Sequence, residues 1–312
     1  MINLNTEIPA PVNIRGVCAT FANEKYGPHE MNDFDIWLAE SKKPTPLVIY
    51  IHGGGFISGN KSKYYKSEDL IRFLEAGVSV AVINYRFMNE PPYGILASIH
   101  DAKRCLQYLR YNAEKYNIDK TRIACSGGSA GAGTSLWLAF SDDLADPENT
   151  DPVLRESTRL TCAGAFATQS TYDIYRWGEI LGIPENNSPK KLSEIACAFG
   201  FKTAKSLLLP EAEKIRKELD FLAKMTKTAS PFFVFNKQAG GTPTNQDELN
   251  HHPLHAKALK EKALEVGAEA IVYAPEIGIN DPSGKDLVQF FLEKFGITSK
   301  TVRLQDCKTA RP

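Results

Sequence analysis

Short apolar segments rich in β-branched residues alternate along this chain with longer segments of helical periodicity, and this alternation constrains the fold more than any other feature. Segments with strand character occupy residues 32–39, 45–52, 78–86, 122–128, 162–170, 231–237 and 268–276. Helical spacing of apolar residues falls between them, at residues 63–77, 97–117, 130–144, 252–267 and 284–295. This pattern predicts an α/β fold whose mostly parallel sheet is covered by helices on both faces. In such sheets, ligands bind at the carboxyl ends of the strands.

Length and charge narrow the classes of protein to consider. The chain has 312 residues, 43% of them hydrophobic, which is enough to bury a full core. We expect one domain over residues 1–312, because α/β folds of this length often form a single unit. Its 37 Lys and Arg residues balance 37 Asp and Glu residues, without a long block of one sign. Nucleic acid is therefore not an expected partner, since phosphate binding requires a concentrated basic face. The sequence does not indicate an oligomeric state.

Residues 172–228 interrupt the alternation with a long stretch of helix-like pieces between two predicted core strands. We interpret this stretch as an inserted cap over the site; the alternative is a surface excursion without a function. Its aromatic residues include Tyr172, Tyr175, Trp177, Phe199 and Phe201. These side chains either favour an apolar or aromatic group in the substrate or simply pack the cap.

The sequence predicts no membrane span, because no apolar run is long enough to cross a bilayer. The first twelve residues lack the basic opening and unbroken apolar core of a signal peptide. We therefore expect a cytoplasmic protein, or an exported one whose leader is absent from this sequence. No C-x-x-C spacing occurs, and we expect most cysteines to be reduced core residues, with a disulfide in an exported form as the alternative. The six cysteines are Cys18, Cys105, Cys125, Cys162, Cys197 and Cys307.

The strongest chemical signal is GGSAG at residues 127–131, a G-x-S-x-G pattern between a predicted strand and a predicted helix. A serine in such a sharp turn adopts a strained backbone and needs small residues two positions away, which Gly127 and Gly131 provide. Its hydroxyl then lies at a helix N-terminus, where N–H groups favour negative charge. We predict that Ser129 is a nucleophile; a glycine-rich phosphate loop or a plain turn is the alternative.

A second glycine run, HGGG at residues 52–55, follows another predicted strand. Because each glycine costs conformational entropy on folding, three in a row indicate a need for bare backbone. Acyl transfer creates an oxyanion, and each preorganised N–H donor contributes about 2.7–4 kcal/mol to its stabilisation. We assign Gly54, Gly55 and Ala130, the residue after Ser129, as these donors. We expect His52 to brace the loop through a backbone hydrogen bond.

With both motifs in place, the chain resembles the α/β-hydrolase superfamily, specifically its HGGG esterases and lipases, including the acetyl-xylan and feruloyl esterase-like branch. The resemblance runs from residue 26 to the last helix. It is carried by HGGGF at residues 52–56, NYRFM at residues 84–88 and the segment 97–132 that ends in SGGSAGA. The resemblance implies an eight-stranded sheet, no cofactor, and hydrolysis of carboxylic esters through a serine acyl-enzyme.

The chain departs from this family in the rest of the catalytic triad. The family places a histidine after the strand predicted at residues 268–276, but the loop here, EIGINDPSGKD, contains none. A serine needs an adjacent base, and NQDELNHHPLH at residues 245–255 offers one. We predict His252 as the base and His251 as its alternative; local capping by both is the purely structural interpretation. No metal site is expected there, because Pro253 disrupts the one-face spacing of two helical histidines.

The acid that orients the histidine is predicted to be Asp247, from the same loop. Asp281, in the loop that usually carries the histidine, and Asp173 are the alternatives.

The predicted function is therefore that of a serine carboxylesterase acting on a small-molecule ester with a short or aromatic acyl group. A pseudoenzyme or binding protein that kept the fold but lost its base is the alternative. An amidase or formamidase is a weaker alternative, since the same apparatus cleaves amides.

Overall fold

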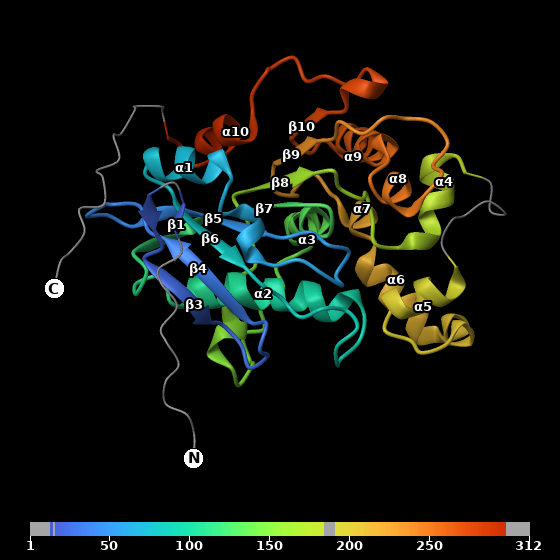
Figure 1. The fold of residues 1–312 in the computed structure, drawn as a ribbon, viewed down its shortest axis with the longest axis horizontal. Helices are drawn as coiled ribbons and strands as arrows, with labels where there is room; N and C mark the ends of the chain where they lie inside the picture. The colour runs from blue at the N-terminus through green and yellow to red at the C-terminus, as the bar shows by residue number, and fades with distance from the viewer. Residues whose placement is uncertain (1–12, 15, 184–190, 298–312) are drawn as a thin grey trace.

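An eight-stranded sheet runs through the centre of the protein (Figure 1). The computed structural model describes residues 13–14, 16–183 and 191–297. In spatial order the strands are β10 (Ala270–Tyr273), β9 (Phe232–Phe235), β8 (Cys162–Phe166), β7 (Ile118–Gly128), β5 (Thr45–Ile51), β6 (Ser79–Ile83), β4 (Asp33–Trp37) and β3 (Phe21–Lys25). Pairing is parallel from β10 to β6 and antiparallel at β4 and β3. A separate two-stranded pair joins β1 (Asn13–Ile14) and β2 (Val17–Cys18).

Helices cover both faces of the sheet, and the side chains of β5 explain why. Its residues are buried throughout, and they alternate between two apolar clusters as the pleat of a strand requires. Leu47 and Ile49 pack with α2 (Ile95–Tyr111), α3 (Ala130–Phe140) and α9 (Pro253–Val266). Val48 and Tyr50 pack with α1 (Glu68–Glu75) and α10 (Leu287–Lys294). The predicted α/β fold with two covered faces is confirmed.

All seven predicted strands are present as β4 to β10, and the five predicted helices as α1, α2, α3, α9 and α10. The segment predicted as one helix at residues 63–77 instead contains a short 3-10 turn, η1 (Lys61–Tyr64), before α1 begins. The elements that were not predicted include the short strands β1 and β2, strand β3 and helix α8 (Gln246–Asn250). Strand β3 reads FANEK, which is too polar to show a buried period, and helix α8 is only five residues long.

The segment 172–228 connects β8 to β9 and lies beyond one end of the sheet, on the right of Figure 1. Its residues 184–190 lie outside the described part of the chain. The segment is anchored on α3, since Trp137 Nε1 donates to Glu218 O at 3.1 Å and Tyr172 OH donates to Ala130 O. Its elements are η3 (Ile174–Arg176), α4 (Trp177–Leu181), α5 (Leu192–Ala198), η5 (Ala204–Leu208), α6 (Pro210–Leu219) and α7 (Phe221–Lys224).

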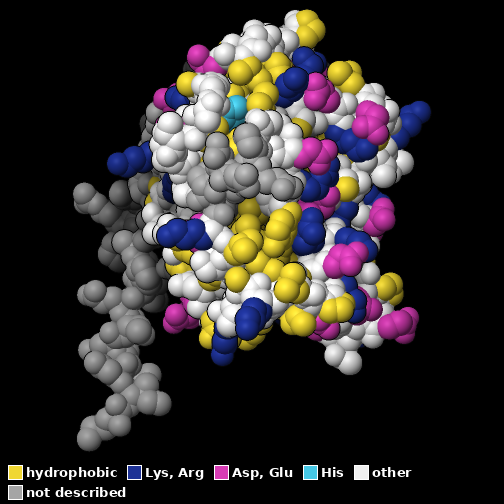
Figure 2. All heavy atoms as spheres, turned by 90° about the vertical axis from the view of Figure 1, so that its right-hand side faces the viewer, with side chains coloured by type: hydrophobic (Ala, Val, Ile, Leu, Met, Phe, Trp, Pro, Cys, Tyr) yellow, Lys and Arg dark blue, Asp and Glu magenta, His cyan; other side chains and the backbone are white. Residues whose placement is uncertain are grey.

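This segment also exposes large apolar side chains. Figure 2 views that side of the molecule and shows hydrophobic side chains gathered on it. The large apolar residues that are exposed in this segment include Tyr175, Leu192, Leu208 and Leu209. Two further 3-10 turns, η2 (Pro152–Arg155) and η6 (Pro275–Ile277), lie in loops elsewhere.

Among the described residues, no helix combines the length and apolar character needed to cross a membrane. Cys105, Cys125 and Cys162 are buried free thiols, as expected for core residues, whereas Cys18 and Cys197 are exposed. Residues 1–12, on which the signal-peptide prediction rests, and Cys307 lie outside the described residues.

Candidate active site

Ser129 lies in the sharp turn between β7 and α3, with φ 53° and ψ −119°. A residue with a Cβ is strained there by about 1–3 kcal/mol, so the surrounding structure must hold it in place. The neighbouring glycines are required by close packing against the end of β5. A Cβ at Gly127 would lie 2.5 Å from Ile51 O, and one at Gly131 would come still closer to the same oxygen. The predicted strand-elbow-helix geometry is therefore confirmed.

Two hydrogen bonds hold the elbow from its sides. Ser129 N donates to Phe166 O of β8 at 2.9 Å. The hydroxyl of Tyr64 accepts from Gly128 N at 3.0 Å and donates to Ile51 O at 2.9 Å, so it links β5 to the elbow. These contacts fix the position from which the Ser129 hydroxyl projects.

The histidine in contact with the serine is His251. Its Nε2 lies 2.7 Å from Ser129 Oγ, and its Nδ1 lies 3.0 Å from Asp247 Oδ1. Asp247 is on α8 and His251 is the residue that ends it, so one helical turn at i, i+4 brings the two side chains together. The His251 side chain is 14% exposed, whereas that of Asp247 is 75% exposed. With Nδ1–H donating to the carboxylate, Nε2 is free to accept the serine proton.

The prediction of His252 as the base is wrong. Its Nε2 lies 2.8 Å from Gly241 O, and since a carbonyl only accepts, this nitrogen carries the proton. Its Nδ1 accepts from Leu254 N at 3.2 Å, which makes His252 the N-cap of α9. Both ring nitrogens of His252 are occupied away from Ser129, and the ring in contact with Ser129 is that of the alternative, His251.

Of the three predicted acids, only Asp247 lies beside the histidine. The carboxylate of Asp281 accepts from Ser283 N at 2.9 Å within its own turn. Asp173 is buried in an ion pair with Arg216, with N–O distances of 2.9 and 3.0 Å. Each of these two carboxylates is bonded to another group, and among the described residues neither is paired with His251.

The N–H groups of Gly54 and Gly55 have no hydrogen-bond acceptor among the described residues. Both residues have positive φ, 113° and 61°, which is the region that favours glycine. The loop closes on itself, since the N–H groups of Ile57 and Ser58 both donate to Gly54 O, at 3.1 and 3.2 Å. Gly55 and Ala130 line one cavity together with Ser129. Two of the three predicted donors, Gly55 and Ala130, therefore lie beside the predicted nucleophile, and Gly54 is adjacent to Gly55 in the chain.

His52 braces this loop as expected, since its Nδ1–H donates to Gly53 O at 2.7 Å. The ring stacks on Tyr85 with centroids 4.2 Å apart. Burial lowers the pKa of His52 to about 4, because its Nε2 has no partner among the described residues and a second proton there would be a buried charge. His52 is therefore a neutral structural group.

Comparison of the sequence with family models identifies the family of this chain. The BD-FAE family model matches residues 34–239, more than half of the 312 residues. The chain belongs to the BD-FAE family. The match includes Ser129 and the glycine run and ends before Asp247 and His251.

Individual relatives of this BD-FAE protein carry the names of ester hydrolases. A chlorogenic acid esterase from Aspergillus niger is 30% identical over 113 residues, which are 33% of this chain and 21% of that protein. The chain thus spans about a fifth of the length of that curated relative.

Solved structures share the fold. A truncated carbohydrate esterase from gut microbiota has a TM-score of 0.63 at 19% identity, covering 91% of this chain and 99% of the other. Esterase 2 from Thermogutta terrifontis has a TM-score of 0.55 at 18% identity, covering 92% of each chain. An acetyl ester-xyloside bifunctional hydrolase from Caldicellulosiruptor lactoaceticus has a TM-score of 0.56 at 20% identity, covering 76% of this chain and 75% of the other. These likenesses confirm the α/β-hydrolase fold.

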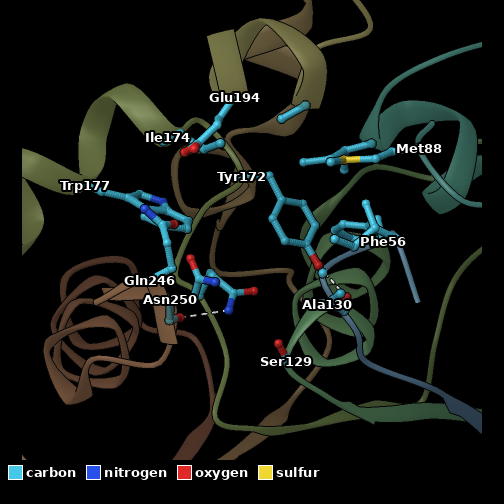
Figure 3. A pocket seen from close by; sticks show the side chains of 15 residues that line it. Phe56, Met88, Ser129, Ala130, Tyr172, Ile174, Trp177, Glu194, Gln246 and Asn250 are labelled. Atoms are coloured by element: carbon cyan, nitrogen blue, oxygen red, sulfur yellow. Dashed lines mark hydrogen bonds between the residues drawn. The ribbon is translucent and has the colours of Figure 1, made fainter. Parts of the chain in front are cut away.

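A cavity of about 310 Å³ opens above Ser129 in this BD-FAE protein. Figure 3 shows Phe56 and Met88 on one side and the carboxamides of Gln246 and Asn250 on the other. The segment 172–228 contributes much of the remaining wall, through Tyr172, Ile174, Trp177, Glu194 and Ala198. Within the described residues, no group of three His, Cys, Asp or Glu side chains is arranged to hold a metal ion.

Three side chains, none of them predicted for this role, hold the end of α8. His255 Nε2 bonds to Leu249 O at 3.2 Å, Gln169 Nε2 to Asn250 O at 2.8 Å and Asn236 Nδ2 to His251 O at 2.9 Å. Ser170 N donates to His255 Nδ1, so the proton of that ring is on Nε2, the atom that faces Leu249 O. These three buried donors satisfy consecutive carbonyls that a short helix leaves open. The backbone that carries His251 is therefore fixed from three directions.

Proposed function

We propose that this protein is a serine carboxylesterase in which Ser129 is the nucleophile, His251 the general base and Asp247 the acid that orients it. One observation carries the proposal, the distance of 2.7 Å between Ser129 Oγ and His251 Nε2. That distance is within the range required for proton transfer from the hydroxyl. It favours an active enzyme over a pseudoenzyme, since the imidazole that a pseudoenzyme would lack is in contact with the serine.

In the first half-reaction, Ser129 Oγ attacks the acyl carbon of the ester and its proton passes to His251 Nε2. The imidazolium is stabilised by Asp247 through Nδ1–H. The negative charge on the former carbonyl oxygen is accommodated by the N–H groups of Gly54, Gly55 and Ala130. Collapse of this intermediate breaks the ester bond, and His251 returns its proton to the departing alcohol.

In the second half-reaction, water attacks the acyl carbon of the Ser129 ester while His251 Nε2 takes a proton from it. Collapse of the second tetrahedral intermediate releases the carboxylic acid and returns the proton to Ser129 Oγ. Both halves use the same base and the same N–H donors, so no further group is needed.

The cavity supports an ester with a short or aromatic acyl group as the preferred substrate. Its volume of about 310 Å³ and its largely apolar lining fit a small ester better than a polymer segment. The names of two similar proteins, a chlorogenic acid esterase and an acetyl ester-xyloside bifunctional hydrolase, agree with an aromatic and a short acyl group respectively. Because the segment 172–228 supplies five residues of the wall, we further propose that it acts as a cap that selects the substrate.

Hydrolysis of p-nitrophenyl acetate and butyrate, together with labelling by paraoxon, tests the proposal. We expect the wild type to release p-nitrophenol and to gain one diethylphosphoryl group on the peptide that contains Ser129. Ser129→Ala should lose turnover by about 10⁵- to 10⁶-fold and take up no label. A correctly folded wild type that neither hydrolyses these esters nor becomes labelled would leave a binding protein with a hydrolase fold.

A further inference from the structure

We propose that Gln169 is a specificity residue that accepts a hydrogen bond from a hydroxyl group of the substrate. The inference rests on the proposed esterase function and narrows its substrate to esters that carry a hydroxyl near the scissile bond. It follows from how the Gln169 carboxamide is held.

The Gln169 side chain is buried, with 5% of its surface exposed, and lines the cavity that contains Ser129. Its Nε2 donates to Asn250 O at 2.8 Å, the dashed line beside Asn250 in Figure 3. Because a carbonyl oxygen only accepts, this bond fixes which end of the carboxamide is nitrogen. The oxygen, Oε1, is then held at the other end.

No donor among the described residues reaches Gln169 Oε1, and this atom is not sealed inside the protein. The amide orientation leaves a fixed acceptor at the cavity surface, in a residue that cannot turn away without losing its bond to α8. A ligand that displaces water from this acceptor without offering a donor would lose a hydrogen bond, so a donor from the bound substrate is expected to occupy it.

The surroundings of Gln169 identify the kind of donor. Gln246 and Asn250 line the same side of the cavity, so this wall is made of neutral carboxamides, whereas the opposite wall is apolar (Figure 3). The Oδ1 atom of Asn250 is itself buried without a partner among the described residues. Neutral acceptors in a partly apolar cavity suit a neutral hydroxyl, because a cationic donor would lose its hydration there. Glu194 also lines the cavity, which disfavours an anionic substrate group.

Gln169 also supports the helix next to His251, because its Nε2 donates to Asn250 O. The test must separate this positional effect on catalysis from the effect of Oε1 on substrate specificity. Loss of that bond should slow the hydrolysis of every ester to a similar degree. Loss of the Oε1 acceptor should slow only the hydrolysis of esters with the hydroxyl. The ratio of kcat/KM between a hydroxylated ester and its methyl analogue therefore isolates the specificity role.

Asn236 offers a matched control. Its Nδ2 holds His251 O at 2.9 Å, next to the carbonyl that Gln169 holds, and it is equally buried. It is not among the residues that line the cavity. Asn236→Leu should therefore lower kcat for both members of a substrate pair and leave their ratio unchanged.

The experiment compares the wild type, Gln169→Met and Asn236→Leu on three pairs in which a hydroxyl replaces a methyl group. Methyl 3-hydroxybutanoate with methyl 3-methylbutanoate places the hydroxyl on a short acyl group. Methyl 4-hydroxycinnamate with methyl 4-methylcinnamate places it on an aromatic acyl group. The third pair, 2-hydroxyethyl butanoate with propyl butanoate, places it on the alcohol.

We expect the wild type to prefer the hydroxylated member of at least one pair, and Gln169→Met to reduce that preference by about three- to ten-fold. The pair affected tells whether the hydroxyl belongs to the acyl group or to the alcohol. A wild type that shows no preference in any pair overturns the inference, even if Gln169→Met does not fold. So does a preference that Gln169→Met and Asn236→Leu leave equally unchanged. Activity on these esters without the preference removes only this inference, whereas absence of hydrolysis and of paraoxon labelling removes the proposed function as well.

Discussion

Two adjacent histidines have different hydrogen-bond partners, and the difference is set by where each lies relative to a helix end. His251 ends α8 and its ring faces Ser129, whereas His252 begins α9 and bonds to backbone atoms with both nitrogens. Both are polar, neighbouring and partly or fully buried. Their sequence positions therefore do not distinguish a base from a helix cap, but their hydrogen-bond partners do.

Alanine substitution of each histidine should distinguish the proposed base from the helix cap. His251→Ala removes the proposed base, so kcat should fall about as much as in Ser129→Ala, roughly 10⁵- to 10⁶-fold. His252→Ala removes an N-cap, so it should lower the free energy of unfolding by about 1 kcal/mol. Its kcat should stay within a few-fold of the wild type. Steady-state kinetics and urea denaturation of both variants check this, and a severe loss of kcat in His252→Ala alone would reverse the assignment.

His52 should make the stability of the fold depend on pH. Its pKa is about 4 in the folded protein, below the ordinary value of 6.5, because burial disfavours the charged ring. The unfolded chain thus binds a proton first as the pH falls, and the stability that is present above pH 6.5 is lost as the pH decreases towards about 4. The contribution is about 3 kcal/mol at most.

Urea denaturation between pH 4.5 and 7.5 measures this loss. In His52→Phe, which keeps an aromatic ring against Tyr85, the free energy of unfolding should vary less over that range than in the wild type. Equal pH dependence in the two proteins would show that other groups cause it.

At the scale of elements, α8 is the part of the structure that completes the site. It has only five residues and one turn, so its own hydrogen bonds do not stabilise it, and side chains from other elements hold its ends. Asn245 caps its start, since the side chain accepts from Glu248 N at 3.0 Å and donates to the Glu248 carboxylate at 2.8 Å. The N-x-x-E pattern at residues 245–248 is the signal from which this helix could have been predicted.

Removal of the N-cap of α8 should lower kcat, because it would shift Asp247 and His251 relative to Ser129. Asn245→Ala should destabilise α8 by about 1 kcal/mol, and kcat should fall by roughly five-fold while the melting temperature changes little. Asn245→Asp keeps an acceptor for Glu248 N and should retain most of the activity. If Asn245→Ala and Asn245→Asp were equally impaired, the cap would not be the cause.

At the scale of the whole molecule, the sheet and the elbow were predictable because each rests on local patterns. Apolar runs revealed β4 to β10, and Ser129 with its flanking glycines appears as one contiguous motif. The partner of Ser129 was not predictable to the residue, because the choice between His251 and His252 depends on the helix that α8 forms and on the contacts of Gln169, Asn236 and His255 with its carbonyls. Those contacts join residues up to 81 positions apart in the sequence.

Asp247 lies in the connection after β9 and Asp281 in the loop after β10, so substitution of each acid tests a different part of the sheet edge. Asp247→Asn should lower kcat by about 10²- to 10³-fold, less than loss of the histidine, since this exposed carboxylate is partly replaced by water. Asp281→Asn, in the loop after β10, should leave kcat unchanged. The two variants are compared by kcat on p-nitrophenyl butyrate, and a large effect of Asp281→Asn would mean that the loops after β9 and β10 share the triad.

Asp247 and His251, the proposed acid and base, are four positions apart on one turn, so their spacing is set by the pitch of a helix and not by how two separate loops meet. Local opening of the outer edge of the sheet, at β10 and α10, would therefore leave the pair intact. Conversely, insertion of a single residue between positions 247 and 251 would rotate one partner by about 100° and separate them, although the remainder of the fold would be undisturbed.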